Sequence, residues 1–425
     1  MVDLTVVWAG PYATYLLAHL GAEVIRVEDI HFFPPLTRGI HPRPPAALVK
    51  VNRPQFIWGM PKREVGRRPW DRVPMFNSHA VNKRSVTIPL TTPQGKDLLA
   101  RLVRISDVVI ENNVTETMEK LGVTYEWLRS LREEVIYVRM PAFGTRGRYR
   151  NYRALGSMNE GVVGHNTLRG YADMDPTGVT PVYAADAASG AGAAFATLLA
   201  LHYRRRTGKG QLVELAQTEN FFTFLGQAFM DYFLNGRVQR TLGNRHPYAV
   251  QGCYPCKGED RWVVITLFTD EQFQRFCQAA GHLEWAQDPR FADAISRYRH
   301  HDDLDRLIEG WTRERDHYEV FHTLQRARVP AGPVMDHREA FEDPHLRERG
   351  FFQPAHQEEC GTHLYPRGPF TMSETPPWVR GGPCMLGQDN EYVYKSLLGL
   401  SEEEYRVLVR EGAIGTEYAP NVKVG

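Results

Sequence analysis

The chain has 425 residues, of which 42% are hydrophobic, and this length favours two domains over one. Its formal net charge of +1 excludes the strong charge bias typical of nucleic-acid or membrane-surface proteins. No basic segment followed by an apolar run opens the sequence, and five cysteines suit a reducing compartment, so we expect a cytoplasmic protein without membrane spans.

Residues 3–28 have the pattern of a strand end, a helix and a second strand. Pro11 is placed to open the helix and Gly21 to end it, and apolar residues alternate along residues 23–28. This is one half of a nucleotide-binding α/β layer, in which ligands meet the loop after the first strand. The sequence has no GxGxxG here, so it does not predict a dinucleotide site.

Residues 29–72 are rich in proline, arginine and aromatic residues and show no sustained period. We predict a long ordered loop or lid. Two interpretations stay open for its arginines: they contact phosphates, or they lie in solvent, which the composition favours. These arginines are Arg63, Arg67, Arg68 and Arg72.

Residues 76–144 alternate between short apolar strands and helix. Lys83 and Arg84 precede a strand whose loop can approach phosphates. We predict a helix over residues 91–104, a strand over 107–112 and a further strand over 135–144. Residues 154–170 are predicted to form another helix, followed by a turn that ends in glycine.

Asp186 lies in residues 181–219 and is followed by a run of Ala, Gly and Ser. We predict a helix that starts near Asp186 and ends by residue 207, and a short strand over 211–215. In one interpretation Asp186 only caps a core helix. In the other it is a reactive carboxylate, and its small neighbours leave room for a large ligand.

The second half of the chain is mostly helical in pattern. We predict a helix over residues 221–234, amphipathic helices through 270–325 and a final helix over 402–411. Cys253 and Cys256 form a CxxC, but a zinc site needs about four ligands and no second paired motif follows. We interpret them as an incidental pair of cysteines, and no metal site is predicted.

Four blocks together resemble family III CoA-transferases, the group of formyl-CoA and carnitine CoA-transferases. These blocks are DLTVVWAGP at residues 3–11, FNSHAVNKRS at 76–85, DVVIEN at 107–112 and TGKGQLV at 207–213, the last following the Asp186 helix. The resemblance implies an α/β fold with a Rossmann-like large domain, a smaller α+β domain and an interlaced homodimer. It places the large domain in residues 1–224 and 329–425 and the small domain in 225–328.

The resemblance also implies an activity. A CoA-transferase of the EC 2.8.3 type moves coenzyme A from an acyl-CoA donor to a carboxylic acid acceptor. It would pass through a mixed anhydride and an aspartyl-CoA thioester at Asp186, without a metal or a tightly bound cofactor. The expected partners are an acyl-CoA and a carboxylic acid. We expect contacts with CoA at Val6, Val7, Trp8, Lys83, Ile88, Asn112, Asn113, Lys120 and Phe143.

Two other functions stay open. An α-methylacyl-CoA racemase would keep Asp186 but needs a second proton carrier, which its relatives supply as a histidine. Residues 147–161 contain no histidine, only Tyr152 or Arg153 stands near that place, and His165 comes late. A non-catalytic CoA-binding protein would not need the carboxylate. We therefore favour the transferase.

Overall fold

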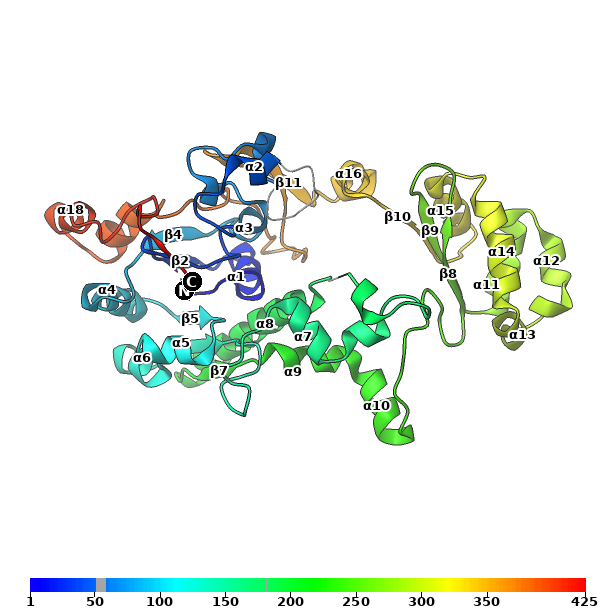
Figure 1. The fold of residues 1–425 in the computed structure, drawn as a ribbon, viewed down its shortest axis with the longest axis horizontal. Helices are drawn as coiled ribbons and strands as arrows, with labels where there is room; N and C mark the ends of the chain where they lie inside the picture. Colours follow the sequence, from blue (N-terminus) through cyan, green and yellow to red (C-terminus); the bar gives the residue numbers. More distant parts are fainter. Residues whose placement is uncertain (51–58, 181) are drawn as a thin grey trace. The chain divides into compact units, whose positions relative to one another are not determined.

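The computed structural model describes residues 1–50, 59–180 and 182–425. The described residues form two compact units (Figure 1). Unit 1 contains Met1–Val163, Pro181–Phe229 and Glu348–Gly425, and unit 2 contains Gly164–Thr180 and Met230–Arg347. Unit 1 therefore takes chain from both ends of the sequence.

A six-stranded parallel sheet forms the centre of unit 1. Its strands lie in the order β4 (Arg84–Thr87), β2 (Ile25–Glu28), β1 (Val2–Asp3), β5 (Val108–Glu111), β6 (Ile136–Arg139) and β7 (Leu212–Glu214), and every neighbouring pair is parallel. Strands covered on both faces read as short apolar runs, which is how the sequence predicts them. From β1 the chain runs to β2 and β4 on one side and then returns to β5 on the other side of β1, so the order reverses beside β1. Ligands usually bind at such a reversal, outside the carboxyl ends of the strands.

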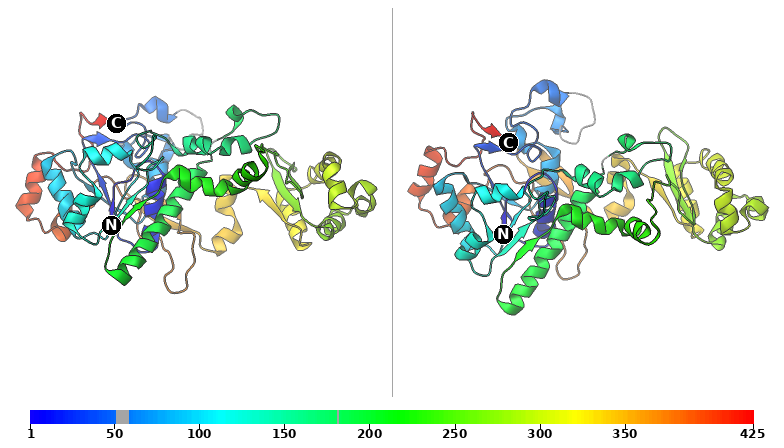
Figure 2. Two further views of the ribbon diagram at one scale, coloured as in Figure 1. Left: turned by 90° about the horizontal axis from the view of Figure 1, so that it is seen from below. Right: turned by 60° about the horizontal axis from the view of Figure 1, so that its bottom comes forward.

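Helices cover both faces of this sheet, as the predicted α/β fold requires, and that prediction is confirmed. On one face, α4 (Pro93–Arg104) and α6 (Tyr125–Leu131) pack with α18 (Glu402–Arg410) in the largest core cluster. On the other face, α1 (Ala9–His19) and α8 (Ala184–Thr207) pack against β5 and β6. Figure 2 shows α8, the long green helix, running beside α1.

The small residues after Asp186 let α1 and α8 approach closely. A Cβ atom added at Gly190 would lie 2.7 Å from the carbonyl oxygen of Ala9 and 2.8 Å from the ring of Tyr12. The expectation that this run makes room for a ligand is therefore wrong at Gly190, where it makes room for a helix. Among the described residues, α8 is also the one helix whose length and composition would suit a membrane span, although part of it is buried in unit 1.

The described part of residues 29–72 packs into unit 1 and does not form a separate lid. Residues 51–58 lie outside the described residues. The segment contains β3 (Phe32–Phe33), α2 (Ala46–Lys50) and two short 3₁₀ turns, Pro61–Arg63 and Pro69–Asp71. Arg38 is fully buried and donates two hydrogen bonds to Glu28 and one to Asp71, each 2.7 Å long.

Two of the arginines in this segment fit neither interpretation made from the sequence. Arg68 is buried and donates to the carbonyl oxygen of Leu386 at 3.1 Å, and Arg72 is buried and donates to that of Pro61 at 2.9 Å. Neither side chain lies in solvent or is available to a phosphate, because both satisfy carbonyl groups inside the protein.

The C-terminal tail closes over the same segment. Strand β13 (Lys423–Val424) pairs in parallel with β3. Tyr418 packs edge-on against Phe33 and Trp70, with ring centroids 5.2 and 5.4 Å apart. The two regions therefore cover each other although almost the whole chain separates them in sequence.

Unit 2 contains an antiparallel sheet of β8 (Val250–Pro255), β9 (Trp262–Leu267) and β10 (Ala331–Val334). Helices α11 (Asp270–Ala280), α14 (His301–Thr312) and α15 (His317–Arg326) cover it with a continuous apolar core.

The remaining elements of the two units are α3 (Pro74–His79), α5 (Thr115–Lys120), α7 (Gly156–Val162), α9 (Gln217–Phe222), α10 (Gly226–Asn235), α12 (Leu283–Gln287), α13 (Ala294–Arg299), α16 (His337–Glu342), α17 (Pro344–Glu348), β11 (Phe352–Gln357) and β12 (Gly361–Pro366), with short 3₁₀ turns at His165–Leu168, Pro176–Gly178, Thr223–Leu225 and Pro289–Phe291 and a π-helical turn at Tyr392–Leu397.

Three predicted elements are longer than the observed ones. The helix predicted over residues 154–170 is α7 followed by a separate 3₁₀ turn, because Gly164 adopts a left-handed φ of 82° between them. The helix predicted over 221–234 is the end of α9, a 3₁₀ turn and α10. The strand predicted over 135–144 ends at Arg139.

Candidate functional site

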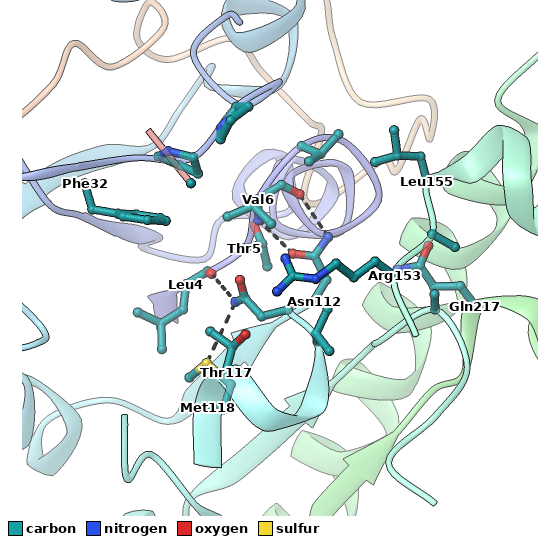
Figure 3. Close-up of a pocket in the computed structure, with 18 of the residues that line it drawn as sticks. Leu4, Thr5, Val6, Phe32, Asn112, Thr117, Met118, Arg153, Leu155 and Gln217 are labelled. Carbon is teal, nitrogen blue, oxygen red and sulfur yellow. Dashed lines mark hydrogen bonds between the residues drawn. The ribbon is translucent and has the colours of Figure 1, made fainter. Parts of the chain in front are cut away.

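A cavity of about 520 Å³ opens in unit 1 where the strand order reverses (Figure 3). Its walls come from the loops after β1 and β5, from α5, from the segment before α7 and from the first turn of α8. Residues from these places that line it are Leu4, Thr5, Val6, Val7, Asn112, Asn113, Val114, Thr117, Met118, Tyr152, Arg153, Ala154, Leu155, Gly156 and Asp186. The fold therefore places Asp186 beside the position where an open α/β sheet binds its ligand.

Asp186 lies in the first turn of α8, and only 7% of the residue is exposed. The backbone N–H of Ala9, the first residue of α1, lies near this carboxylate and favours its charged form. The positive end of the α1 dipole thus faces the carboxylate, which stabilises its charged form. Tyr183, immediately before α8, adopts a left-handed φ of 55°, and such backbone strain is concentrated at functional sites.

The environment of Asp186 raises its pKa from 3.8 to about 7. Burial is the main cause, the nearby charge of Glu160 adds to it, and the Ala9 N–H group opposes both. A carboxyl group with this pKa is substantially ionised at neutral pH yet more basic than an exposed carboxylate. Such a group can act as a nucleophile or as a base.

Gly156, the first residue of α7, lies directly against this carboxylate. A Cβ atom added at Gly156 would lie 1.5 Å from Oδ2 of Asp186, a distance that no side chain can occupy. Only glycine therefore permits the observed approach of α7 to Asp186. Sequence reasoning missed this residue, although the glycine beside Leu155 at the start of a predicted helix was a possible signal.

Arg153 provides a cation for an anionic ligand. Figure 3 shows its side chain extending from the segment before α7 into the cavity. Within residues 1–50, 59–180 and 182–425 it has neither a hydrogen bond nor an ion pair, whereas Arg26, which also lines the cavity, lies 3.3 Å from Glu28 and 3.8 Å from Asp3. From the sequence alone, Arg153 is expected only as a possible proton carrier.

Comparison with known proteins identifies the family. Residues 1–390 match the family described as CoA-transferase family III. The chain belongs to this family. It is 33% identical over 413 residues to the succinyl-CoA–D-citramalate CoA-transferase of Chloroflexus aurantiacus, which covers 96% of this chain and 95% of that protein. It is 30% identical over 399 residues to the succinate–glutarate CoA-transferase of Agrobacterium fabrum, covering 93% of this chain and 94% of that protein.

A solved structure agrees with this assignment. The crystal structure of a CaiB/BaiF family protein from Brucella suis has a TM-score of 0.78 and 28% sequence identity, and covers 93% of this chain and 97% of that one. The predicted family and the predicted CoA-transferase activity of the EC 2.8.3 type are both confirmed. As a family III CoA-transferase, the protein uses CoA thioesters as substrates.

Four of the CoA contacts expected in this family III CoA-transferase line the cavity: Val6, Val7, Asn112 and Asn113. Asn112 accepts a hydrogen bond from the N–H of Val6 at 2.7 Å and donates one to its carbonyl oxygen at 2.9 Å (Figure 3). The N–H of Val7 donates to Thr37 at 3.0 Å. These two N–H groups therefore already have partners within the protein.

Five expected contacts do not line the cavity within the described part of the chain. Lys83 is buried, and its Nζ donates to Thr14 at 2.7 Å and to the carbonyl oxygen of Pro11 at 2.8 Å. Burial lowers its pKa to about 8, although Asp3 opposes the shift. This ammonium group ties α1 to the sheet and is not directed at the cavity.

The other four have different surroundings. Ile88 is fully buried in the core, and Lys120 is exposed and pairs with Glu116 at 3.0 Å. Trp8 packs among aromatic rings, the nearest being that of His79 at a centroid distance of 5.0 Å. Phe143 packs edge-on against Tyr149, with ring centroids 5.9 Å apart.

Proposed function

We propose that Asp186 is the nucleophile that carries CoA from an acyl-CoA donor to a carboxylic acid acceptor. The observation that carries this proposal is a buried carboxylate, with a pKa of about 7, in the wall of a cavity placed where α/β sheets bind ligands. Family membership gives the reaction class, and the geometry supports Asp186 as the residue proposed to carry it.

The proposed reaction proceeds by four exchanges at carbonyl carbon. A carboxylate oxygen of Asp186 attacks the thioester, the C–S bond breaks, and CoA leaves as a thiolate from the resulting mixed anhydride. The thiolate attacks the Asp186 carbonyl, which releases the donor acid and leaves an aspartyl-CoA thioester. The acceptor carboxylate attacks that thioester, the C–S bond breaks, and the CoA thiolate leaves behind a second mixed anhydride. The thiolate then attacks the acceptor carbonyl of this anhydride, which forms the product thioester and releases Asp186 as a carboxylate. No net proton is consumed. Covalent attachment to Asp186 replaces one difficult reaction between the acceptor acid and the acyl-CoA with several easier ones.

The lining of the cavity supports an assignment of particular residues to the charged and the apolar parts of CoA. Arg153 would contact a phosphate group, because its guanidinium is the cation in the described lining that lacks an acidic partner. Phe32, Leu90 and Met118 also line the cavity and would contact the base and the apolar part of the ligand. No tightly bound cofactor is needed for this chemistry.

The lining also favours transfer over racemisation. Tyr152 and Arg153 line the same cavity as Asp186, and the described lining includes no histidine. Phenol and guanidinium groups do not ordinarily exchange protons near neutral pH, as a second proton carrier must. Several relatives are named for succinyl-CoA or succinate, so the CoA thioester of a dicarboxylic acid is the donor we propose to test first.

The experiment that tests the proposal is to trap the covalent intermediate. The protein is incubated with succinyl-CoA, treated with hydroxylamine, digested and analysed by mass spectrometry. We expect a hydroxamate on Asp186 in the wild type, and neither the adduct nor CoA transfer in Asp186→Asn. An Asp186→Asn variant that still exchanges CoA between acids would overturn the proposal.

We also propose that the protein is a cytoplasmic homodimer that acts without nucleic acid or membrane. An exposed apolar stripe on α8, formed by Phe195, Leu198, Leu199 and Tyr203, supports a partner surface, since such patches on soluble proteins mark interaction sites. Interlacing of the two chains is the family expectation and belongs to the same proposal.

A further inference from the structure

Helix α7 directs two residues at the first turn of α8. Gly156 and Glu160 are four residues apart and therefore lie on the same face of α7. Gly156 meets the Asp186 carboxylate, as described above, and Glu160 is buried with 1% of its surface exposed. Its Oε1 accepts a hydrogen bond of 2.7 Å from the backbone N–H of Ala184, the first residue of α8.

This hydrogen bond replaces an ordinary helix cap. The first N–H groups of a helix lack partners within it and are usually satisfied by the side chain of the residue before the helix. Here that residue is Tyr183, which forms no side-chain cap and whose backbone is left-handed. The acceptor comes instead from another helix, so the start of α8 depends on α7.

We propose that Glu160 is a positioning residue that fixes the first turn of α8 and so holds the Asp186 carboxylate against Gly156, where an acyl-CoA reaches it. This inference rests on the proposed role of Asp186 as the nucleophile. Ala184 and Asp186 are two residues apart in one helical turn, so an error at the cap moves the carboxylate. Small errors of this kind are costly, because attack on the thioester carbon needs a closely defined approach.

The charge of Glu160 has a second effect. Two other titratable or charged groups lie on this side of α8: Tyr12 beside Gly190 from α1, and Arg153 in the lining of the same cavity as Asp186. Among the described residues, Glu160 is the charge that raises the pKa of Asp186, second only to burial. Glu160 therefore has two separable effects: it holds the Asp186 carboxylate in place, and it raises the pH at which that carboxylate ionises.

Two substitutions at Glu160 separate these contributions. Glu160→Gln keeps an acceptor oxygen for Ala184 but removes the charge. We expect a maximal kcat close to that of the wild type and a rising limb of the pH–rate profile whose midpoint, near pH 7 in the wild type, is lower by about one unit. Glu160→Ala removes the acceptor, and we expect kcat to fall about 10- to 100-fold at every pH while KM for succinyl-CoA changes little.

A matched control is Glu219→Gln, the same substitution at an exposed carboxylate on the neighbouring α9. It is expected to leave both the midpoint and kcat unchanged. The positioning role is overturned if Glu160→Ala, folded by circular dichroism, keeps the wild-type kcat, and the separate charge effect is overturned if Glu160→Gln does not move the midpoint. Asp186→Asn is measured in parallel: if it still transfers CoA, the proposed function fails, whereas an inactive Asp186→Asn with unaltered Glu160 variants rejects only the role of Glu160.

Discussion

Asp186 is held in an environment that favours its protonated form, and this has a thermodynamic consequence. Folding raises the pKa of the carboxyl group from 3.8 to about 7, so the folded protein binds this proton more tightly than the unfolded chain does. Through this group, the free energy of unfolding is greatest at low pH and falls as the pH rises from about 4 to about 7. Above that range the full cost of the buried charge is present.

Asp186→Asn should therefore stabilise the protein while abolishing transfer. The amide stays neutral at every pH, so we expect the free energy of unfolding at pH 8 to rise by about 1–3 kcal/mol over the wild type. Urea denaturation at pH 5 and pH 8 measures this effect. The gain should be smaller at pH 5, and a gain that is the same at both values would contradict the raised pKa.

Gly156→Ala should damage catalysis more than folding. The added methyl group would overlap Oδ2 of Asp186 and must displace either the carboxylate or α7. We expect kcat to fall at least about 100-fold with little change in KM for succinyl-CoA, measured by steady-state kinetics.

Gly226→Ala is the control for that substitution, because a Cβ atom at Gly226 meets nothing within 4 Å. Its activity should match that of the wild type. Wild-type activity in Gly156→Ala would show that the close approach of α7 is not needed for catalysis.

The sequence predicts some of these residues and not others, for a physical reason. Asp186 can be found because its small neighbours are contiguous with it and its motif is local. Gly156 and Glu160 approach the first turn of α8 from a separate segment, and Arg153 of that segment lines the same cavity, which no local pattern records. Lys83 shows the converse, since a cation just before a strand resembles a phosphate ligand, but here its Nζ donates hydrogen bonds to buried oxygens.

At the level of elements, the order of strands and helices is well predicted by apolar runs and by Gly and Pro positions. Residues 29–72 are the main exception. Their Pro- and Arg-rich composition suggests a solvated loop, yet Arg38 and Arg68 meet partners in β2 and near the C-terminal tail. Composition reveals the charges, but it does not reveal which distant groups will neutralise them.

Arg38→Met tests whether this segment fastens unit 1. Although burial alone would raise it, Arg38 and Arg26 hold the pKa of Glu28 at about 2, and Asp71 pairs with Arg38 at 2.7 Å. Removing the guanidinium leaves two buried acids short of a partner, so we expect the free energy of unfolding to fall by about 3–5 kcal/mol.

Urea denaturation with Arg63→Met as the control checks this prediction. Arg63 is exposed, and its replacement should change the free energy of unfolding by less than about 0.5 kcal/mol. Equal stability of the two variants would mean that the Arg38 network does not support the fold.

For the whole molecule, the exposed stripe on α8 predicts self-association. Phe195 and Leu199 are 64% and 52% exposed. They lie four residues apart and therefore on the same face of α8, so this apolar face has no cover within one chain. We expect sedimentation velocity to show a species of twice the mass of one chain. Leu199→Glu should shift it toward the monomer, because a charge would have to be buried in the interface.

Ile105→Glu introduces the same charge at an exposed isoleucine after α4, and it should leave the sedimentation coefficient unchanged. A monomeric wild type at micromolar concentration would contradict the proposed homodimer.

The contact of Tyr418 with Phe33 and Trp70 constrains how the protein is made. Translation proceeds from the amino terminus at about 5–20 residues per second. Phe33 is therefore added to the chain roughly 20 to 80 s before Tyr418. During that interval the nascent chain exposes rings that only its last part covers. Slower translation would lengthen this exposure, and chaperones that shield the emerging polypeptide should raise the soluble yield.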